Sequence, residues 1–180
     1  MKHAFFYTLI ILISISCNLI IKNDEVLLPQ YKHLKDKTIS NFEVLNSYKD
    51  SSINYARSEK PLVVCYVETG CTKCVLELKQ WNDFIKNNNL FSEVDFLVIA
   101  YGEKDFYFDY HLKTKKYFNF DVFIDINQDF LSKNNIGDII VVKTLLLDQN
   151  NRAVFYGSPI IFPELKKSFL ISVNNLLQNN

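Results

Sequence analysis

The sequence has little glycine, little proline and no excess of either charge. Only four glycines and four prolines occur among its 180 residues, and 20 Lys and Arg residues balance 20 Asp and Glu residues. The sequence contains no glycine-rich phosphate loop and no GxGxxG pattern, so no cofactor is expected. Because it has no basic stripe, no nucleic-acid partner is expected either.

The chain does contain enough apolar sequence to form a core. Hydrophobic residues make up 48% of it and charged residues 22%, which suits one globular domain of this length. No internal repeat is visible. We therefore expect a single folded domain, preceded by a separate N-terminal segment.

The N-terminal segment has the layout of a secretory signal. Lys2 and His3 precede an apolar run that ends at Cys17, and small residues come directly before this cysteine. The pattern resembles a bacterial lipoprotein signal, in which the cysteine is lipidated and becomes the mature N-terminus. Ser14 stands where such signals usually have leucine. The resemblance implies that Cys17 carries a lipid.

Two other interpretations of this segment remain open. The 18 nearly uninterrupted apolar residues from Ala4 to Ile21 are long enough for an uncleaved membrane-spanning anchor. A soluble secreted protein would need cleavage elsewhere, and no A-x-A site is visible. All three interpretations place the domain outside the cytoplasm, where disulfides persist. The expected organisation is a signal or anchor over 1–17, a tether over 18–37 and a domain over 38–180.

Strands and helices alternate along most of the domain. This order predicts an α/β fold with a central mixed sheet and helices on both faces. The turn over 148–151 is expected to join the last two strands as a hairpin. A short edge strand is possible within 38–45. The expected strands are 62–68, 94–102, 121–126, 141–148 and 152–157, and the expected helices are 73–87, 103–120, 127–135 and a last helix from Pro163.

Three of the four cysteines lie within ten residues, and two of them form the motif Cys71-Thr-Lys-Cys74. The motif follows an apolar strand broken by Gly70, and the helical period of apolar residues begins just after it. A thiolate at a helix N-terminus is stabilised by unpaired N–H groups and the helix dipole. Cys71 is therefore the expected nucleophile and Cys74 the resolving thiol. Lys73 adds a positive charge between them.

The segments LVVCYVETGCTKCVLELKQW, FLVIAYG, VFIDI and VVKTLLLDQNNRAVFYG together resemble the thioredoxin superfamily. Within it, they are similar to the TlpA-like, membrane-tethered thiol:disulfide oxidoreductases of bacteria. The resemblance covers Thr38 to Leu177. It implies a thioredoxin-like fold, a redox-active Cys71–Cys74 disulfide that needs no cofactor, and partners among the thiols and disulfides of envelope proteins.

The sequence departs from this family at two positions. Family members have a cis-proline opposite the CxxC, and counting back six residues from Asp148 places Val142 there. A cis bond before a non-proline residue costs about 2.5–4 kcal/mol, so we expect a trans bond and an altered docking edge for substrate. Gly70 replaces the usual tryptophan before the first cysteine, which predicts a more open site.

Cys65 occupies the position where thioredoxins have a buried acid. A thiol there cannot act as a carboxylate base at neutral pH, and strand alternation places Glu68 on the other face. We interpret Cys65 as a small buried apolar residue.

The motif is compatible with other functions of its sulfurs. A permanent structural disulfide, or a redox-inactive domain that binds a partner, remains open. A zinc site is not expected, because His33 and His111 are scattered in sequence and a structural site needs four ligands. Both histidines are expected at the surface. A peroxiredoxin-like site is disfavoured because Glu68, not threonine, lies three residues before Cys71.

Overall fold

The computed structural model describes residues 29–103, 105–114, 118 and 120–178. The expected signal or anchor, including Cys17, lies outside these residues. Within the described part, no helix is both long enough and apolar enough to cross a membrane.

Six strands of the described chain form one mixed sheet in the order β1-β4-β3-β2-β5-β6. Strands β2, β3 and β4 are parallel to one another, whereas β1, β5 and β6 join the sheet in antiparallel pairs. The predicted mixed sheet is therefore confirmed. The strands are β1 (Asn46–Ser47), β2 (Leu62–Glu68), β3 (Asp95–Tyr101), β4 (Val122–Ile124), β5 (Thr144–Leu147) and β6 (Ala153–Tyr156).

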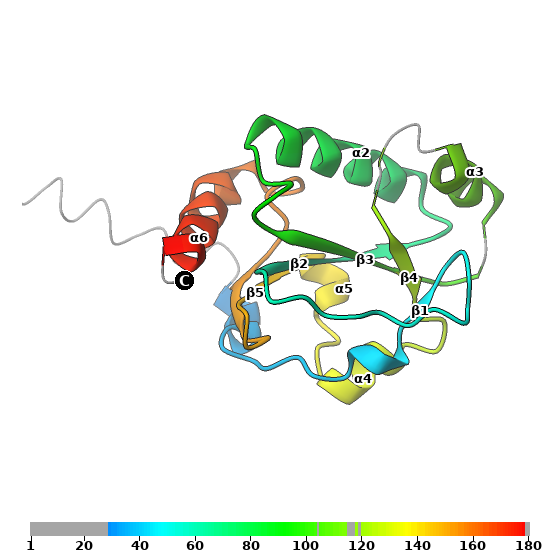
Figure 1. Ribbon diagram of the computed structural model, residues 1–180, viewed down its shortest axis with the longest axis horizontal. Helices are drawn as coiled ribbons and strands as arrows, with labels where there is room; N and C mark the ends of the chain where they lie inside the picture. The colour runs from blue at the N-terminus through cyan, green and yellow to red at the C-terminus, as the bar shows by residue number, and fades with distance from the viewer. Residues whose placement is uncertain (1–28, 104, 115–117, 119, 179–180) are drawn as a thin grey trace, which may run out of the picture.

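Helices cover both faces of the sheet, as the order of elements predicted. Figure 1 shows α2 and α3 on one side of the sheet and α4 and α5 on the other. The last helix, α6, contributes to the core on the same face as α2. The helices are α2 (Thr72–Asn87), α3 (Phe106–Thr114), α4 (Asp129–Asn134), α5 (Ile139–Val142) and α6 (Lys166–Gln178), with 3-10 turns η2 (Pro29–Leu34), η3 (Phe42–Val44) and η4 (Pro163–Leu165).

Strand β2 lies between the two cores. Its first six residues are buried, because the strand is covered on both faces. Alternating side chains divide between the cores: Val63 and Cys65 belong to the cluster beneath α2, and Val64 and Tyr66 belong to the cluster beneath α5. This double burial explains why the segment is almost continuously apolar.

The predicted strand over 141–148 is wrong at its start. Helix α5 occupies this stretch up to Val142, whose N–H donates to the Asp138 carbonyl at 3.1 Å, and strand β5 begins only at Thr144. Val142 and Ile139 are completely buried against the sheet. Burial of these side chains outweighs the preference of β-branched residues for strands.

The predicted helix over 103–120 is described only as far as Thr114, and its orientation was not evident from the sequence. Phe106, Tyr110 and Lys113 recur at helical spacing and form an exposed side. Tyr117, which continues this spacing in the sequence, lies outside the described residues. The side chains buried against the core are those of Phe108, His111 and Leu112.

His111 is not a surface residue, contrary to expectation. It is only 3% exposed and lies between two tyrosine rings, with ring centroids 4.4 Å from Tyr107 and 5.1 Å from Tyr110. His33 is at the surface as expected, where its Nε2 lies 2.8 Å from an Asp138 carboxylate oxygen.

The segment before β2 packs closely against the domain. Leu34, within the stretch expected as tether, is completely buried, and the Asp36 N–H donates to the Ala153 carbonyl at 2.7 Å. The possible edge strand in 38–45 is mostly replaced by η3, which buries Phe42. The short edge strand β1 follows directly after it.

Candidate active site

The two cysteines of the CxxC motif lie where β2 passes into α2. They form a disulfide with a Cα–Cα separation of 5.2 Å, which lies within the usual range. Cys71 is half-buried and Cys74 is buried. The accessible sulfur is therefore the first one, which is the arrangement that nucleophilic attack by Cys71 requires.

Cys71 is also the N-cap of α2. Its Sγ accepts a hydrogen bond from the Cys74 N–H at 3.1 Å, and Cys71 has the extended backbone conformation typical of a cap. In the reduced protein the same N–H and the positive end of the helix dipole would stabilise a thiolate at this atom. The local structure thus favours ionisation of Cys71.

The helix that carries the motif follows directly from its sequence. Val75, Leu78, Trp81 and Ile85 are buried at helical spacing, as the sequence predicted. The helix ends at Asn87, as predicted, within a run of three asparagines of which Asn89 adopts a left-handed conformation. Strong local signals at both ends therefore place Cys71 and Cys74 at the start of α2.

Cys65 lies in β2 on the face that α2 covers. Burial raises the pKa of its thiol to about 12, although the nearby Thr144 hydroxyl opposes the shift. The two side chains are in contact, with Sγ and Oγ1 3.9 Å apart. Cys65 is thus a neutral thiol at physiological pH and cannot take up a proton as the family's acid would.

Glu77 is the acidic residue that sequence reasoning missed. It lies one turn beyond Cys74 on α2 and is half-buried. Burial raises the pKa of its carboxyl, and the positive charges of Lys143 and Lys73 oppose that shift. Its charge also acts on the Cys65 thiol. The sequence signal that could have identified Glu77 is its spacing of three residues from Cys74, which places both on the same side of a helix.

Gly70 and Lys73 lie on the open side of the site. No described atom lies within 4 Å of the position that a Cβ would take on Gly70, which agrees with an open site. Lys73 is exposed between the two cysteines. Its charge is available to an incoming partner as well as to Glu77.

The position of the missing cis-proline is occupied by the end of α5. The bond before Val142 is trans, and no cis bond occurs among the described residues. Lys143 follows with a φ of 64° and ends the helix. Its carbonyl accepts from the Tyr66 N–H at 3.0 Å, so the turn is joined to β2 beside Cys65. Lys143, in the left-handed conformation, thus reverses the direction of the chain between α5 and β5.

The backbone N–H groups of this turn are already engaged. Val141 donates to the Asp138 carbonyl at 3.0 Å, and Lys143 donates to the Ile139 carbonyl at 2.7 Å. An incoming strand therefore finds no free donor at Val141, Val142 or Lys143. Val142, the position where the sequence predicted an altered edge, is the last residue of a short helix.

No group of three or more metal-binding side chains occurs within the described ranges. His33 and His111 lie on separate elements, in η2 and α3, and neither is brought to the disulfide by any described contact.

Comparisons with known proteins agree with this geometry. No family model and no curated protein matches the sequence. Among solved structures, a Bacteroides vulgatus protein assigned to the thiol-disulfide oxidoreductases superposes with a TM-score of 0.57, at 16% identity over 79% of this chain and 98% of that one. A thioredoxin-like protein from Porphyromonas gingivalis gives 0.56 at 16% identity, covering 76% and 90% of the two chains.

A Chlorobium tepidum protein assigned as the thiol:disulfide interchange protein DsbE is also similar. Its TM-score is 0.55 at 13% identity, over 77% of this chain and 97% of that one. These similarities confirm the predicted fold. The chain therefore has the thioredoxin-like fold, with its Cys71–Cys74 disulfide at the start of the helix that follows a central strand.

Proposed function

We propose that the protein is an extracytoplasmic thiol:disulfide oxidoreductase that exchanges electrons with envelope proteins through Cys71 and Cys74. The observation that carries this proposal is the half-buried Cys71 sulfur at the N-cap of α2, bonded to the buried Cys74. The thioredoxin-like fold supports it, because solved proteins of the same fold include chains assigned to thiol-disulfide exchange.

In the reducing direction the exchange has two steps. The Cys71 thiolate attacks one sulfur of a partner disulfide, and the other partner sulfur leaves as a thiolate that takes up a proton. The Cys74 thiolate then attacks Cys71 Sγ, which forms the internal disulfide and releases the second partner thiolate. Two electrons pass to the partner, and two protons pass with them. The reverse sequence oxidises a partner dithiol.

Cys74 is buried and must lose a proton before it can attack. Glu77, three residues further along α2, is a half-buried acidic residue on the same side of the helix. Burial favours the protonated form of Glu77, whereas the positive charges of Lys73 and Lys143 favour the ionised form. We assign Glu77 the role of proton acceptor in the resolving step.

The test measures the Cys71 thiol pKa and the reduction potential of the pair. We expect a pKa clearly below 8.5, and turnover in an assay of disulfide reduction. A Cys74→Ser variant should accumulate mixed disulfides through Cys71. A thiol pKa near 8.5 together with no turnover would exclude the proposal.

A second candidate function is a redox-inactive module that binds a partner in the altered groove near Val142. The engaged N–H groups of α5 favour this alternative, because they remove a docking edge for disulfide substrates. A disulfide that stays oxidised in mild reductant, with no turnover by the reduced form, would support it. Rapid turnover would exclude it.

The N-terminal segment supports a proposal about the cellular location. We propose that Cys17 is lipidated and that the domain is tethered to a membrane on the extracytoplasmic side. Metabolic labelling with a fatty acid should mark the full chain, and a Cys17→Ala variant should lose the label. A labelled, normally processed Cys17→Ala variant would contradict the lipid anchor.

A further inference from the structure

Exposed apolar side chains are concentrated at the end of the sheet that carries the CxxC motif. The parallel strands β2, β3 and β4 all end at this edge, and β5 begins there. Cys71 follows β2, Phe106 and Tyr107 follow β3, and Ile126 follows β4. The exposed large apolar residues on or next to this edge are Leu76, Phe106, Tyr107, Tyr110, Ile126 and Val141.

Helix α3 contributes three of these residues. Phe106 is 87% exposed, so its ring adds almost nothing to the packing of the domain. The rings of Tyr107 and Tyr110 pack edge-on against the buried His111, which limits their movement. Exposed aromatic rings held in place are typical of binding surfaces. We call the surface formed by Phe106, Tyr107 and Tyr110 the α3 aromatic face.

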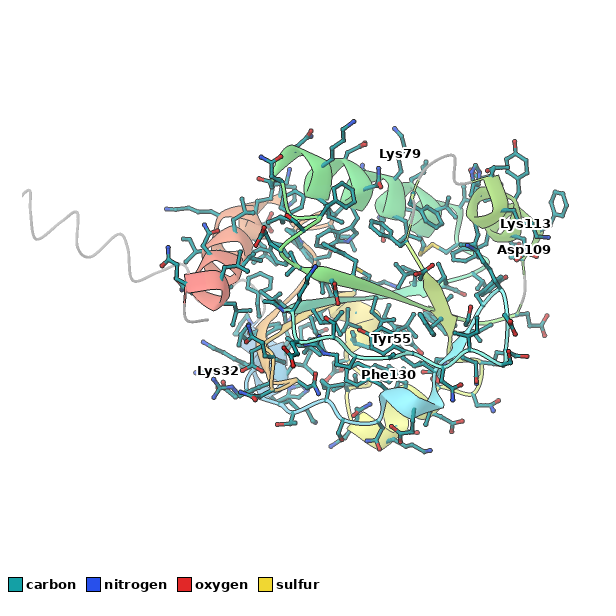
Figure 2. All side chains as sticks on the ribbon, in the orientation of Figure 1. Lys32, Tyr55, Lys79, Asp109, Lys113 and Phe130 are labelled. Carbon is teal, nitrogen blue, oxygen red and sulfur yellow. A yellow bond between two sulfur atoms is a disulfide. The ribbon has the colours of Figure 1, made fainter. Side chains whose placement is uncertain are left out.

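Hydrogen bonds join the loop before Cys71 to the chain segment that precedes α3. The Thr69 N–H donates to the Tyr101 carbonyl at 3.0 Å, and the Thr69 hydroxyl donates to the Glu103 carbonyl. Phe106 comes three residues after Glu103, so its Cα lies within about 11 Å of that residue. Figure 2 shows α3, where Asp109 and Lys113 are labelled, at the end of α2 that carries the yellow disulfide bond. A partner joined to Cys71 therefore reaches this face.

The turn opposite the disulfide offers a partner no free N–H at Val141, Val142 or Lys143. Side-chain contacts therefore contribute a larger share of the affinity than they would beside a free strand edge. Charges of both signs lie beside Cys71 in the chain, on Glu68 and Lys73, and α3 itself carries Asp109 and Lys113. An apolar centre with a mixed polar rim suits a polypeptide more than a lipid surface.

We infer that the α3 aromatic face binds a polypeptide segment of the exchange partner, with apolar side chains next to the partner's cysteine. The partner's target disulfide therefore lies in an extended or incompletely folded segment, where such side chains are accessible. Small disulfides, which lack flanking side chains, do not use the face. This inference rests on the proposed function for its chemistry, but the binding it describes can be measured separately.

The kinetic test compares three substrates. One is a peptide disulfide whose cysteines are flanked by Phe and Leu, one is the same peptide with Ser and Gln as flanks, and one is oxidised glutathione. We expect kcat/KM to be about tenfold or more higher for the apolar peptide than for the polar peptide. Phe106→Ser should lower kcat/KM for the apolar peptide about fivefold and leave that for glutathione unchanged.

Matched controls separate this face from general hydrophobicity. Phe91→Ser and Ile171→Ser remove apolar side chains that are 56% and 45% exposed elsewhere on the domain. These two variants should have the same kcat/KM for the apolar peptide as the wild type. Equal rates for the two peptides, or equal losses in Phe106→Ser and Phe91→Ser, would overturn the inference.

A binding test remains valid if the protein has no exchange activity. A cysteine-free version of the apolar peptide, carrying a benzophenone, is photo-cross-linked to the full chain, and the adducts are mapped by mass spectrometry. Adducts should fall within 105–114 and decrease in Phe106→Ser. Adducts elsewhere, or cross-links joining two copies of the chain through α3, would overturn the inference. Absence of turnover with every disulfide would overturn only the proposed function.

Discussion

The two borders of the candidate site are built in opposite ways. At one border β2 passes into α2, and the apolar strand, the capping Cys71 and the amphipathic helix all agree with the local sequence. At the other border α5 passes into β5, where β-branched residues form a helix that ends in a left-handed Lys143. The first border determines the position of the two sulfurs, and the second determines which groups of a partner can approach them.

The difference shows which kind of interaction maintains each border. The α2 border depends on residues that are close together in the chain, so its strand, its capping cysteine and its helix can be recognised from the sequence. The α5 border depends on burial of Ile139 and Val142 against strands that are distant in sequence. Substitution of the two sulfurs at the first border should change reactivity, and substitutions at the second border should change stability.

The largest effect is expected at Cys71. Cys71→Ser removes the nucleophile, so the rate of disulfide exchange should fall by about 10³-fold or more. Turnover of a fluorescent peptide disulfide measures the loss. Cys65→Ala is the matched control, because Cys65 is buried and neutral, and it should keep most of the activity. Equal losses in both variants would show that the assay reports general damage to the fold.

The next effect concerns Cys65 and Thr144, which connect the two borders. Burial raises the pKa of Cys65 from 9.0 to about 12, so the folded state disfavours the thiolate. Its stabilising contribution is complete below pH 9 and is lost as the pH rises toward 12. By pH 10.5 the loss amounts to about 2 kcal/mol of unfolding free energy.

Urea unfolding at pH 7, 9 and 10.5 checks this expectation. The wild type should lose stability over that range, and Cys65→Ala should lose about 2 kcal/mol less. A smaller but constant difference at all three pH values would reflect only the cavity left by the substitution. Such a result would contradict a raised pKa of the Cys65 thiol.

A smaller effect is expected at Lys143, in the second border. Its φ of 64° is unfavourable for a β-branched side chain, so Lys143→Ile should lower the unfolding free energy by about 1–2 kcal/mol. Lys143→Asn is the control, since asparagine tolerates this conformation, and it should stay near the wild type. Thermal unfolding of both variants measures the difference. Similar midpoints for the two would argue against a left-handed turn here.

The smallest effect is expected at Gly70, in the first border. A Cβ there meets no described atom within 4 Å, and the glycine does not have a left-handed φ. Gly70→Ala should therefore raise the unfolding free energy by about 0.5 kcal/mol, because it restricts the unfolded chain. Exchange activity should be unchanged. A destabilised variant would mean that the loop before Cys71 needs glycine.

Much of the fold was predictable because its local patterns are strong. The bounds of β2 agree with its apolar run, and the last helix, which the sequence predicted, buries Phe169 and Val173 at helical spacing. The hairpin between β5 and β6 was also predicted, with the Asp148 carboxylate accepting from the Arg152 N–H at 2.8 Å. Each of these features depends on residues close together in the chain.

The candidate site was predictable only in part. The place of Cys71 and Cys74 at the start of α2 followed from the CxxC spacing and the strand before it, whereas their disulfide was implied by the family resemblance. Glu77 was missed because one acidic residue on an amphipathic helix resembles an ordinary solvated residue until its burial is known. His111 was misplaced for the same reason, because its helix turns Phe108 and Leu112 toward the core and leaves Phe106 exposed.

By itself, the sequence determined the thioredoxin-like order of elements and the position of Cys71 and Cys74 at a strand–helix junction. Apolar runs, helical periodicity and turn residues act over short distances, so they need no knowledge of the fold. Only the tertiary structure decided that α5 replaces the proline edge, that Glu77 is half-buried near Cys65, and that an aromatic face lies beside the disulfide. These features depend on burial, and burial is set by which distant segments the sheet brings together.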